Sequence, residues 1–169
     1  NIIYDVAGTH GNQCIYTKGV GNRIENNVLV VGEKCDSAIR SFFMADERCD
    51  RHIYKRNIVL FENPKAAIYD FNNWSDDRVA ESDENLFWNP NGSLRQKGSP
   101  SGESYEKWKE MFDGKFDRNS INADPLFSDA ARRDFRLKED SPALKLGFKS
   151  IETKGIGLLG DYPARLARP

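Results

Sequence analysis

Short apolar stretches that each follow an asparagine recur along the first half of the chain. They begin at residues 1, 27, 57 and 85, at intervals of 26, 30 and 28 residues. The four stretches are Asn1-Ile2-Ile3-Tyr4, Asn27-Val28-Leu29-Val30, Asn57-Ile58-Val59-Leu60 and Asn85-Leu86-Phe87-Trp88. A polar residue ahead of a short apolar strand, repeated at a period of roughly 20–50 residues, is typical of a solenoid.

Two further apolar series recur in step with the asparagines. One series is Ile15, Ile39 and Ile68, and the other is Ile24, Ile53 and Val79. Each repeat therefore reads as three short strands joined by turns. Strands stacked about 4.8 Å apart would pair with the equivalent strands of the next repeat around a shared apolar interior. This pattern predicts an all-β chain folded as a right-handed parallel β-helix.

The recurring asparagines predict a ladder of side chains at one corner of the fold. Stacked Asn amides can hydrogen-bond to one another and to the turn backbone. Asn is also a common turn residue, and that preference alone would place it between strands. Agreement of the four asparagines with the two other series favours the ladder.

The repeats define residues 1–89, and residues 90–169 differ in kind. Residues 90–103 are rich in Gly, Pro and Ser, which indicates a loop. Ser104 then precedes an amphipathic segment whose apolar positions are Tyr105, Trp108, Met111 and Phe112, which predicts a short helix with Ser104 as its N-cap. We interpret residues 90–169 as loop, short helix and irregular C-terminal cap of the same domain, because exposed strand edges need cover.

The first apolar stretch starts at Asn1 with no strand before it. We therefore expect this chain to pack against an upstream β-helix portion of the same protein. We also expect the protein to be secreted or periplasmic.

Charge and composition narrow the choice of partners. The net charge is −1, which gives no reason to expect nucleic acid or an anionic membrane surface. No apolar run approaches the length of a transmembrane helix. The spacing of Cys14, Cys35, Cys49 and the two histidines matches no zinc motif, so no metal site is predicted; Cys35 and Cys49 are a candidate disulfide in a secreted protein.

A candidate binding surface follows from the strand alternation. If Ile15, Ile39 and Ile68 point inward, the residues after them point outward and stack on successive strands. These residues are Tyr16, Arg40 and Tyr69. Aromatic rings stack on the C–H faces of sugars and Arg offers a fork of donors, so the column suits carbohydrate binding. The alternative is a stabilising cation–π stack without a ligand.

Candidate catalytic groups lie near the same face. Equivalent residues on neighbouring strands lie about 5 Å apart, and equivalent residues two strands apart lie about 10 Å apart. These distances are near the carboxylate separations of retaining and inverting glycosidases, respectively. We select Asp46, Glu47 and Asp70 as candidate acids, with His10, in a Gly-flanked turn, assisting. Asp is also common in turns for conformational reasons alone.

The tail and one internal segment resemble a known family. The tail motifs are Ala123-Asp124-Pro125-Leu126-Phe127, Asp134-Phe135-Arg136-Leu137 and Asp140-Ser141-Pro142-Ala143-Leu144-Lys145-Leu146-Gly147-Phe148. Together with Asn26-Asn27-Val28-Leu29-Val30-Val31-Gly32-Glu33, they resemble bacterial right-handed parallel β-helix proteins of carbohydrate metabolism, and the nearest of these is glycoside hydrolase family 141. The resemblance implies action on plant cell-wall glycans.

Three functions are consistent with these features. The leading hypothesis is hydrolysis of glycosidic bonds in a polysaccharide or oligosaccharide by paired carboxylates, without a cofactor. The second is a polysaccharide lyase for uronate-containing glycans, with Arg40 and Lys18 or Arg48 neutralising the uronate and with calcium as a candidate cofactor in that case alone. The third is a non-catalytic carbohydrate-binding module.

Overall fold

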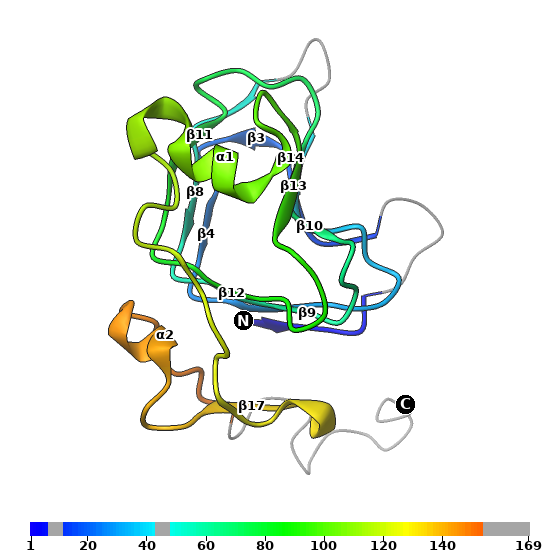
Figure 1. Cartoon of the computed structure of the whole chain (residues 1–169), viewed down its shortest axis with the longest axis vertical. Coiled ribbons are helices and arrows are strands. Elements are labelled where there is room, and N and C mark those ends of the chain that lie inside the picture. The colour runs from blue at the N-terminus through cyan, green and yellow to red at the C-terminus, as the bar shows by residue number, and fades with distance from the viewer. Residues whose placement is uncertain (7–11, 43–47, 154–169) are drawn as a thin grey trace, which may run out of the picture.

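The computed structural model describes residues 1–6, 12–42 and 48–153. Most of its strands are parallel and gather in three sheets (Figure 1). The first, which we call the Asn-led sheet, has the order β1 (Ile2–Ile3), β5 (Val28–Val31), β9 (Ile58–Phe61), β12 (Leu86–Trp88) and β15 (Ile121–Asn122). The second, the lateral sheet, has the order β14 (Gly102–Ser104), β13 (Arg95–Ser99), β10 (Ala67–Phe71), β6 (Ser37–Ser41) and β2 (Gln13–Thr17).

The remaining elements are smaller. A three-stranded sheet contains β11 (Val79–Asp83), β8 (His52–Lys55) and β4 (Arg23–Glu25). Two-stranded sheets pair β3 (Gly19–Val20) with β7 (Cys49–Asp50), and β16 (Phe127–Asp129) with β17 (Asp134–Leu137). The helices are α1 (Tyr105–Glu110) and α2 (Pro142–Lys145), and two short 3-10 helices are η1 (Met111–Gly114) and η2 (Ala130–Arg132). In the described residues no helix has the length and apolar character needed to cross a membrane.

The predicted fold class, a right-handed parallel β-helix, is wrong. The described strands form five separate sheets of two to five strands rather than one long β-helix, and the pairs β13–β14 and β16–β17 are antiparallel. The repeat period and the apolar pattern predict which short strands pair. They do not predict whether the pairing between strands continues through the bends of the chain. The structure is a mostly-β chain of small sheets, several of them parallel.

Strands of the Asn-led sheet are apolar on both faces because both faces are covered. Leu29, Val59 and Phe87 belong to an interior cluster that also contains residues of the lateral and three-stranded sheets. Val28 and Ile58 instead belong to a second buried cluster, which includes the tail residues Phe127, Phe135, Ala143 and Phe148. The tail with β17 and α2 lies along this outer face (Figure 1).

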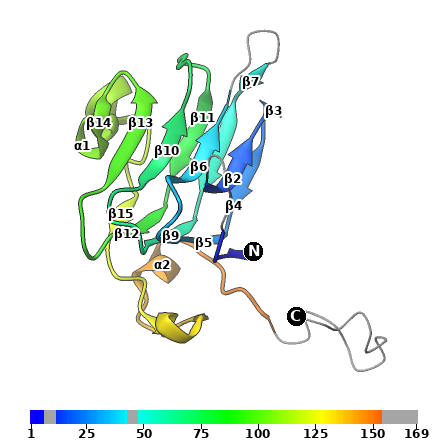
Figure 2. The same cartoon turned by 90° about the vertical axis from the view of Figure 1, so that its right-hand side faces the viewer.

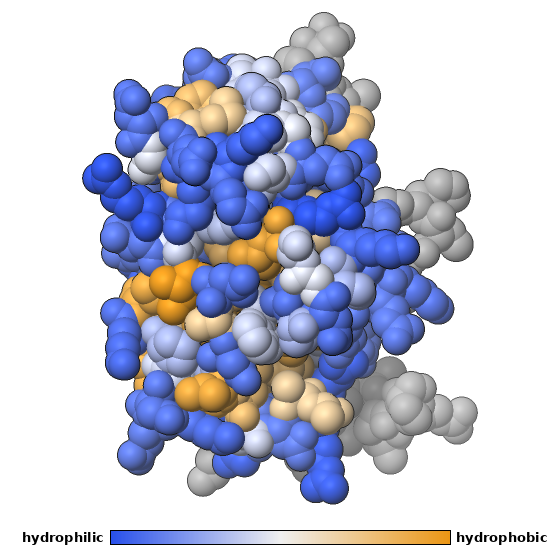
Figure 3. Space-filling view, in the orientation of Figure 1, coloured by the Kyte–Doolittle hydropathy of each residue, from blue (hydrophilic) through white to orange (hydrophobic). Residues whose placement is uncertain are grey.

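Helix α1 forms where its sequence pattern predicts and covers one end of the interior. The Ser104 side chain accepts a hydrogen bond from the Lys107 backbone N–H at 3.2 Å, as an N-cap does. Trp108 is fully buried against Phe116 and the rings of the lateral sheet. The side of the molecule that carries α1 is otherwise mainly hydrophilic, with small apolar patches (Figure 3).

The asparagines form a continuous ladder along the Asn-led sheet. Side-chain Nδ2 of each donates to Oδ1 of the next, from Asn1 to Asn27 at 3.0 Å, Asn27 to Asn57 at 2.9 Å and Asn57 to Asn85 at 3.1 Å. Asn85 then donates to Asp117 Oδ1 at 3.2 Å. The amides of Asn27, Asn57 and Asn85 also donate to backbone carbonyl oxygens, for example Asn57 Nδ2 to Ile24 O at 2.8 Å. The predicted ladder is confirmed.

The corner before each strand has a repeated backbone conformation. Asn26, Arg56 and Glu84, which directly precede three of the ladder asparagines, have φ values of 55°, 49° and 58°. This left-handed region is unfavourable for residues other than Gly, by roughly 1–2 kcal/mol. The ladder and the strand pairing on either side compensate for that strain.

Removal of one ladder amide is expected to destabilise the chain strongly. Asn57→Ala removes four hydrogen bonds, which are those from the Asn27 backbone N–H and Nδ2 and those to Ile24 O and Asn85 Oδ1. The Asn27 backbone N–H then lacks its acceptor in a buried place, and an orphaned buried group costs about 1–3 kcal/mol. We expect a loss of at least about 2 kcal/mol in urea unfolding followed by tryptophan fluorescence. The control Asn91→Ala alters an exposed turn residue. Equal stability of the two variants would contradict a structural role for the ladder.

The acidic end of the ladder predicts a pH dependence. Burial raises the pKa of the Asp117 carboxyl group, although hydrogen bonds from Ser120, Trp108 and Ser82 oppose that rise. A carboxyl group with a higher pKa in the folded chain contributes most stability below its unfolded pKa, and this contribution is lost as the pH rises through the folded pKa. We therefore expect the unfolding free energy of wild type relative to Asp117→Asn to fall as the pH increases from about 4.

Urea unfolding of both chains between acidic and neutral pH measures this difference. The exposed Asp140, substituted by Asn, provides the control for the loss of one carboxyl group. A rise of the wild-type advantage with pH would show that the hydrogen bonds, rather than burial, dominate at Asp117.

Candidate functional site

One row of side chains crosses the lateral sheet from strand to strand. Tyr16 in β2 is the register partner of Arg40 in β6, and Arg40 is the partner of Asp70 in β10. Asp70 is in turn the partner of Lys97 in β13. These four strands lie side by side in Figure 2. We call Tyr16, Arg40, Asp70 and Lys97 the lateral row.

Tyr69 does not belong to this row, so its expected place beside Arg40 on the surface is wrong. The register pairs Tyr69 with Ile39, and Ile39 with Ile15. Tyr69 is 1% exposed, and its hydroxyl group hydrogen-bonds Ser82 Oγ at 2.7 Å. A shift of one residue in register moves a side chain to the other face of a strand, and Asp70 takes the outer position instead.

The same shift occurs in the three-stranded sheet. Ile24 is the partner of Tyr54 rather than of Ile53. Tyr54 is fully buried and its ring stacks on Tyr69 at 5.4 Å between centroids. The interior is therefore lined by tyrosines at two positions where an aliphatic series was expected.

The exposed end of the lateral row combines an aromatic ring with a cation. Tyr16 is 43% exposed. Its ring stacks on Phe42 at 5.9 Å between centroids, with 28° between the planes, and Arg40 Cζ lies 5.3 Å from the Phe42 centroid. The Lys18 Nζ lies 5.8 Å from the Tyr16 centroid. Phe42 was not selected from the sequence, although it is two residues after Arg40 and so shares its side of an extended chain.

The hydrogen-bonding capacity of Arg40 is only partly used. Its Nε lies 3.8 Å from Asp70 Oδ2, an ion-pair distance that is too long for a hydrogen bond. That nitrogen is buried and has no hydrogen-bond partner. The guanidinium group is thus held between Phe42 and Asp70, and the Arg40 side chain is 30% exposed.

Of the candidate acids, only Asp70 can be placed. Asp46, Glu47 and His10 lie outside the described residues. The row neighbours of Asp70 are the cations Arg40 and Lys97. A retaining pair needs carboxyl groups about 5–5.5 Å apart, and the adjacent positions of the row do not supply one.

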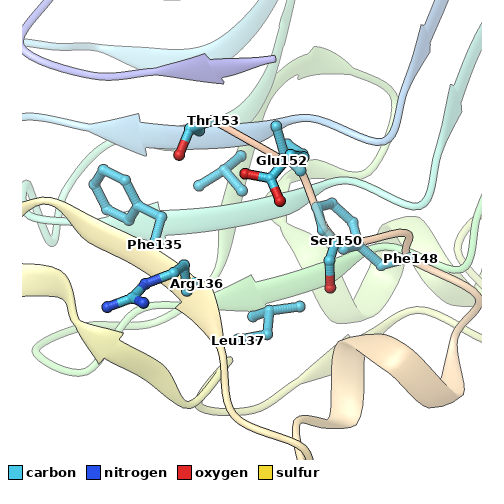
Figure 4. A pocket seen from close by; sticks show the side chains of 9 residues that line it. Phe135, Arg136, Leu137, Phe148, Ser150, Glu152 and Thr153 are labelled. Atoms are coloured by element: carbon cyan, nitrogen blue, oxygen red, sulfur yellow. The ribbon is translucent and has the colours of Figure 1, made fainter. Parts of the chain in front are cut away.

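Five cavities in the described residues have no residue of the lateral row in their walls. One of about 360 Å³ lies between the tail and β5 (Figure 4). It is lined by Val28, Phe135, Arg136, Leu137, Phe148 and residues 150–153, and Arg136 there is paired with Asp134 at 2.5 Å. This cavity is a packing gap under the tail rather than a constellation of catalytic groups. The lateral row, by contrast, forms an open face.

Metal ligands do not gather in the part of the chain that the structure describes. No group of three or more His, Cys, Asp or Glu side chains there could hold a metal ion. The three cysteines are free thiols, and the pairing of Cys35 with Cys49 considered from the sequence is not formed. Cys49 Sγ lies 3.2 Å from His52 Nε2 instead.

Comparison with known proteins gives no relative. No family model matches the sequence, and neither a curated protein nor a solved structure matches the chain. The resemblance to glycoside hydrolase family 141 therefore stays a prediction from the residues quoted above, and function must be argued from the geometry of the chain itself.

Tyr69 lies in the interior and Tyr16 on the surface, so replacing each by Ala should lower the free energy of unfolding by different amounts. We expect Tyr69→Ala to cost about 3–5 kcal/mol, because it opens a cavity in the core and removes a hydrogen bond. We expect Tyr16→Ala to cost less than about 1 kcal/mol, since the ring is half exposed. Urea unfolding of both variants measures the difference. Similar losses would mean that the register of β10 against β6 is not the one described here.

Proposed function

We propose that the open face of the lateral sheet binds carbohydrate. The observation that carries the proposal is the alignment of an exposed Tyr16 ring with the partly exposed side chain of Arg40. Rings stack on the apolar C–H faces of sugars, and the guanidinium fork donates to hydroxyl or carboxylate oxygens. Phe42 supports the planar arrangement of both groups.

The shape of the face favours a polymer over a single small molecule. Sites for small molecules are usually concave, whereas no residue of the lateral row lines the five cavities named above. The row crosses four parallel strands, so its groups are spaced at about 4.8 Å intervals along a line. A glycan chain laid along this line would contact ring, cation and carboxylate in succession.

Hydrolysis of the bound glycan remains a prediction that the row alone does not support. A paired-carboxylate mechanism needs a second acid within about 5–10 Å of Asp70. Asp46 and Glu47, which lie outside the described residues, are the candidates for that acid. Lyase chemistry would instead use Arg40 with Lys18 near Tyr16. Binding without turnover is the function that the described geometry supports best.

A binding assay with matched variants tests the proposal. We expect retention of the chain on immobilised plant cell-wall polysaccharides and a loss of at least about tenfold in affinity for Tyr16→Ala, which removes the stacking ring. Arg40→Ala should weaken binding by a similar factor. Tyr4→Ala and Arg23→Ala are the controls, because Tyr4 is 44% exposed and the Arg23 side chain is 60% exposed, away from the row.

Two outcomes would overturn the carbohydrate proposal. One is the absence of retention on every polysaccharide tested. The other is binding that the Tyr4 and Arg23 controls weaken as much as the row variants do.

Turnover is tested separately with Asp70→Asn. If Asp70 is a catalytic acid, reducing-end release at saturating polysaccharide falls at least about a hundredfold. Products that absorb in the ultraviolet would indicate a lyase. Full activity of Asp70→Asn would remove Asp70 from the mechanism, and retention of polysaccharide without products would identify a binding module.

A further inference from the structure

Cations and a carboxylate alternate along the lateral row. Arg40 in β6 is the register partner of Asp70 in β10, and Asp70 is the partner of Lys97 in β13. Lys97 was not selected from the sequence, because only the pairing of β13 with β10 brings it into the row. Arg and Lys side chains are cationic at neutral pH and Asp is anionic. These three residues together therefore retain one positive charge.

The three charged groups lie on the same side of the lateral sheet. Gln96, which precedes Lys97, is fully buried, and successive side chains of a strand point to opposite faces. Tyr69, which precedes Asp70, is buried in the same way. Lys97 is partly exposed, and the side chains of Arg40 and Asp70 are 30% and 19% exposed. All three groups are thus within reach of a ligand on the open face.

The Asp70 carboxylate is shared between two cations. Its Oδ2 lies 3.8 Å from Arg40 Nε, an ion pair without a hydrogen bond. Lys97 is the neighbour on its other side, one strand spacing of about 4.8 Å away. One carboxylate balances only one of its two neighbours, so the row keeps a positive potential that attracts anions.

A second cation of β13 shows a balanced arrangement. Arg95, two residues before Lys97, lies on the same side of the strand and is ion-paired with Glu103 of β14. Arg95 thus has a carboxylate of its own, whereas Lys97 shares Asp70 with Arg40. The net charge of the whole chain is −1. The positive charge of the row is therefore a local feature of this face and not a property of the chain as a whole.

We propose that the glycan bound by the lateral row is anionic, a polymer whose sugars carry carboxylate or sulfate groups, and that Lys97 determines this specificity. The inference rests on the proposed carbohydrate binding and names the class of its ligand. Arg40 and Lys97 are two strands apart, at about 10 Å. Each can pair with a different anionic group of one polymer, while the Tyr16 ring stacks on a sugar beside them.

Retention of the whole chain on matched polysaccharides tests the class of ligand. Polygalacturonate is compared with its methyl ester, and dextran sulfate with dextran, at low ionic strength. The sugar backbone is the same within each pair, so only the anionic groups differ. We expect the anionic member of at least one pair to bind about threefold or more tighter, which is the scale of one exposed ion pair. The pair that shows the preference distinguishes carboxylate from sulfate.

Single-charge variants test whether the preference arises at the row. Lys97→Ala should weaken binding of the anionic polymer about threefold and leave binding of the neutral polymer unchanged. Lys138→Ala, which removes an exposed cation from the tail, is the matched control and should change neither. Asp70→Asn removes the competing carboxylate and should strengthen binding of the anionic polymer. Salt raised from about 10 mM to about 1 M shortens the Debye length from about 30 Å to about 3 Å and should abolish the preference.

The outcomes separate this inference from the carbohydrate proposal. Equal affinity of the wild-type chain for both members of both pairs would overturn the inference, as would equal losses in Lys97→Ala and Lys138→Ala or weaker anionic binding in Asp70→Asn. The carbohydrate proposal would survive these results, because polysaccharides would still be retained. Absence of retention on every polysaccharide would instead remove the carbohydrate proposal, and this inference with it.

Discussion

The directional asparagine ladder is the interaction on which the rest of the structure depends. Every amide in it donates in the same direction, from Asn1 toward Asn85. The last amide of such a row of hydrogen bonds needs an acceptor, because a further asparagine there would itself need an acceptor in turn. Asp117 Oδ1 is that acceptor. The ladder also fixes the spacing between the strands that follow it, since the backbone N–H groups of Asn27 and Asn57 each donate to Oδ1 of the next asparagine.

Asp117 connects this ladder to the other parts of the interior. Its oxygens accept from Trp108 in α1 at 2.9 Å and from Ser82 in β11 at 2.9 Å. Tyr69 of the lateral sheet donates to it at 3.4 Å. One buried carboxylate therefore joins the Asn-led sheet, the three-stranded sheet, the lateral sheet and the covering helix. A buried network of this kind is stabilising only if each member is satisfied, which explains why the donors converge from so many elements.

The ladder also explains the error in the expected binding face. Ile39 and Tyr69 each follow a ladder asparagine, Asn27 and Asn57, by twelve residues. A constant offset from the ladder would have aligned Ile39 with Tyr69, as the structure does. The preference for an aliphatic core residue selected Ile68 instead and placed Tyr69 outside. Tyrosine is tolerated inside because its hydroxyl group finds Ser82 and Asp117 as partners.

The sequence by itself determined the parallel pairing of the Asn-led strands, the ladder between them and the helix that begins after Ser104. Each of these depends on local spacing or on a repeated residue type, so the pattern contains the information. Tertiary structure alone decided the division into small separate sheets, the lateral row in which Asp70 replaces Tyr69, and the pairing of Cys49 with His52. These features depend on register, on bends between strands and on partners distant in the chain. A shift of one residue reverses the side on which a side chain lies, and hydrophobic pattern does not resolve that shift where both faces of a strand are buried.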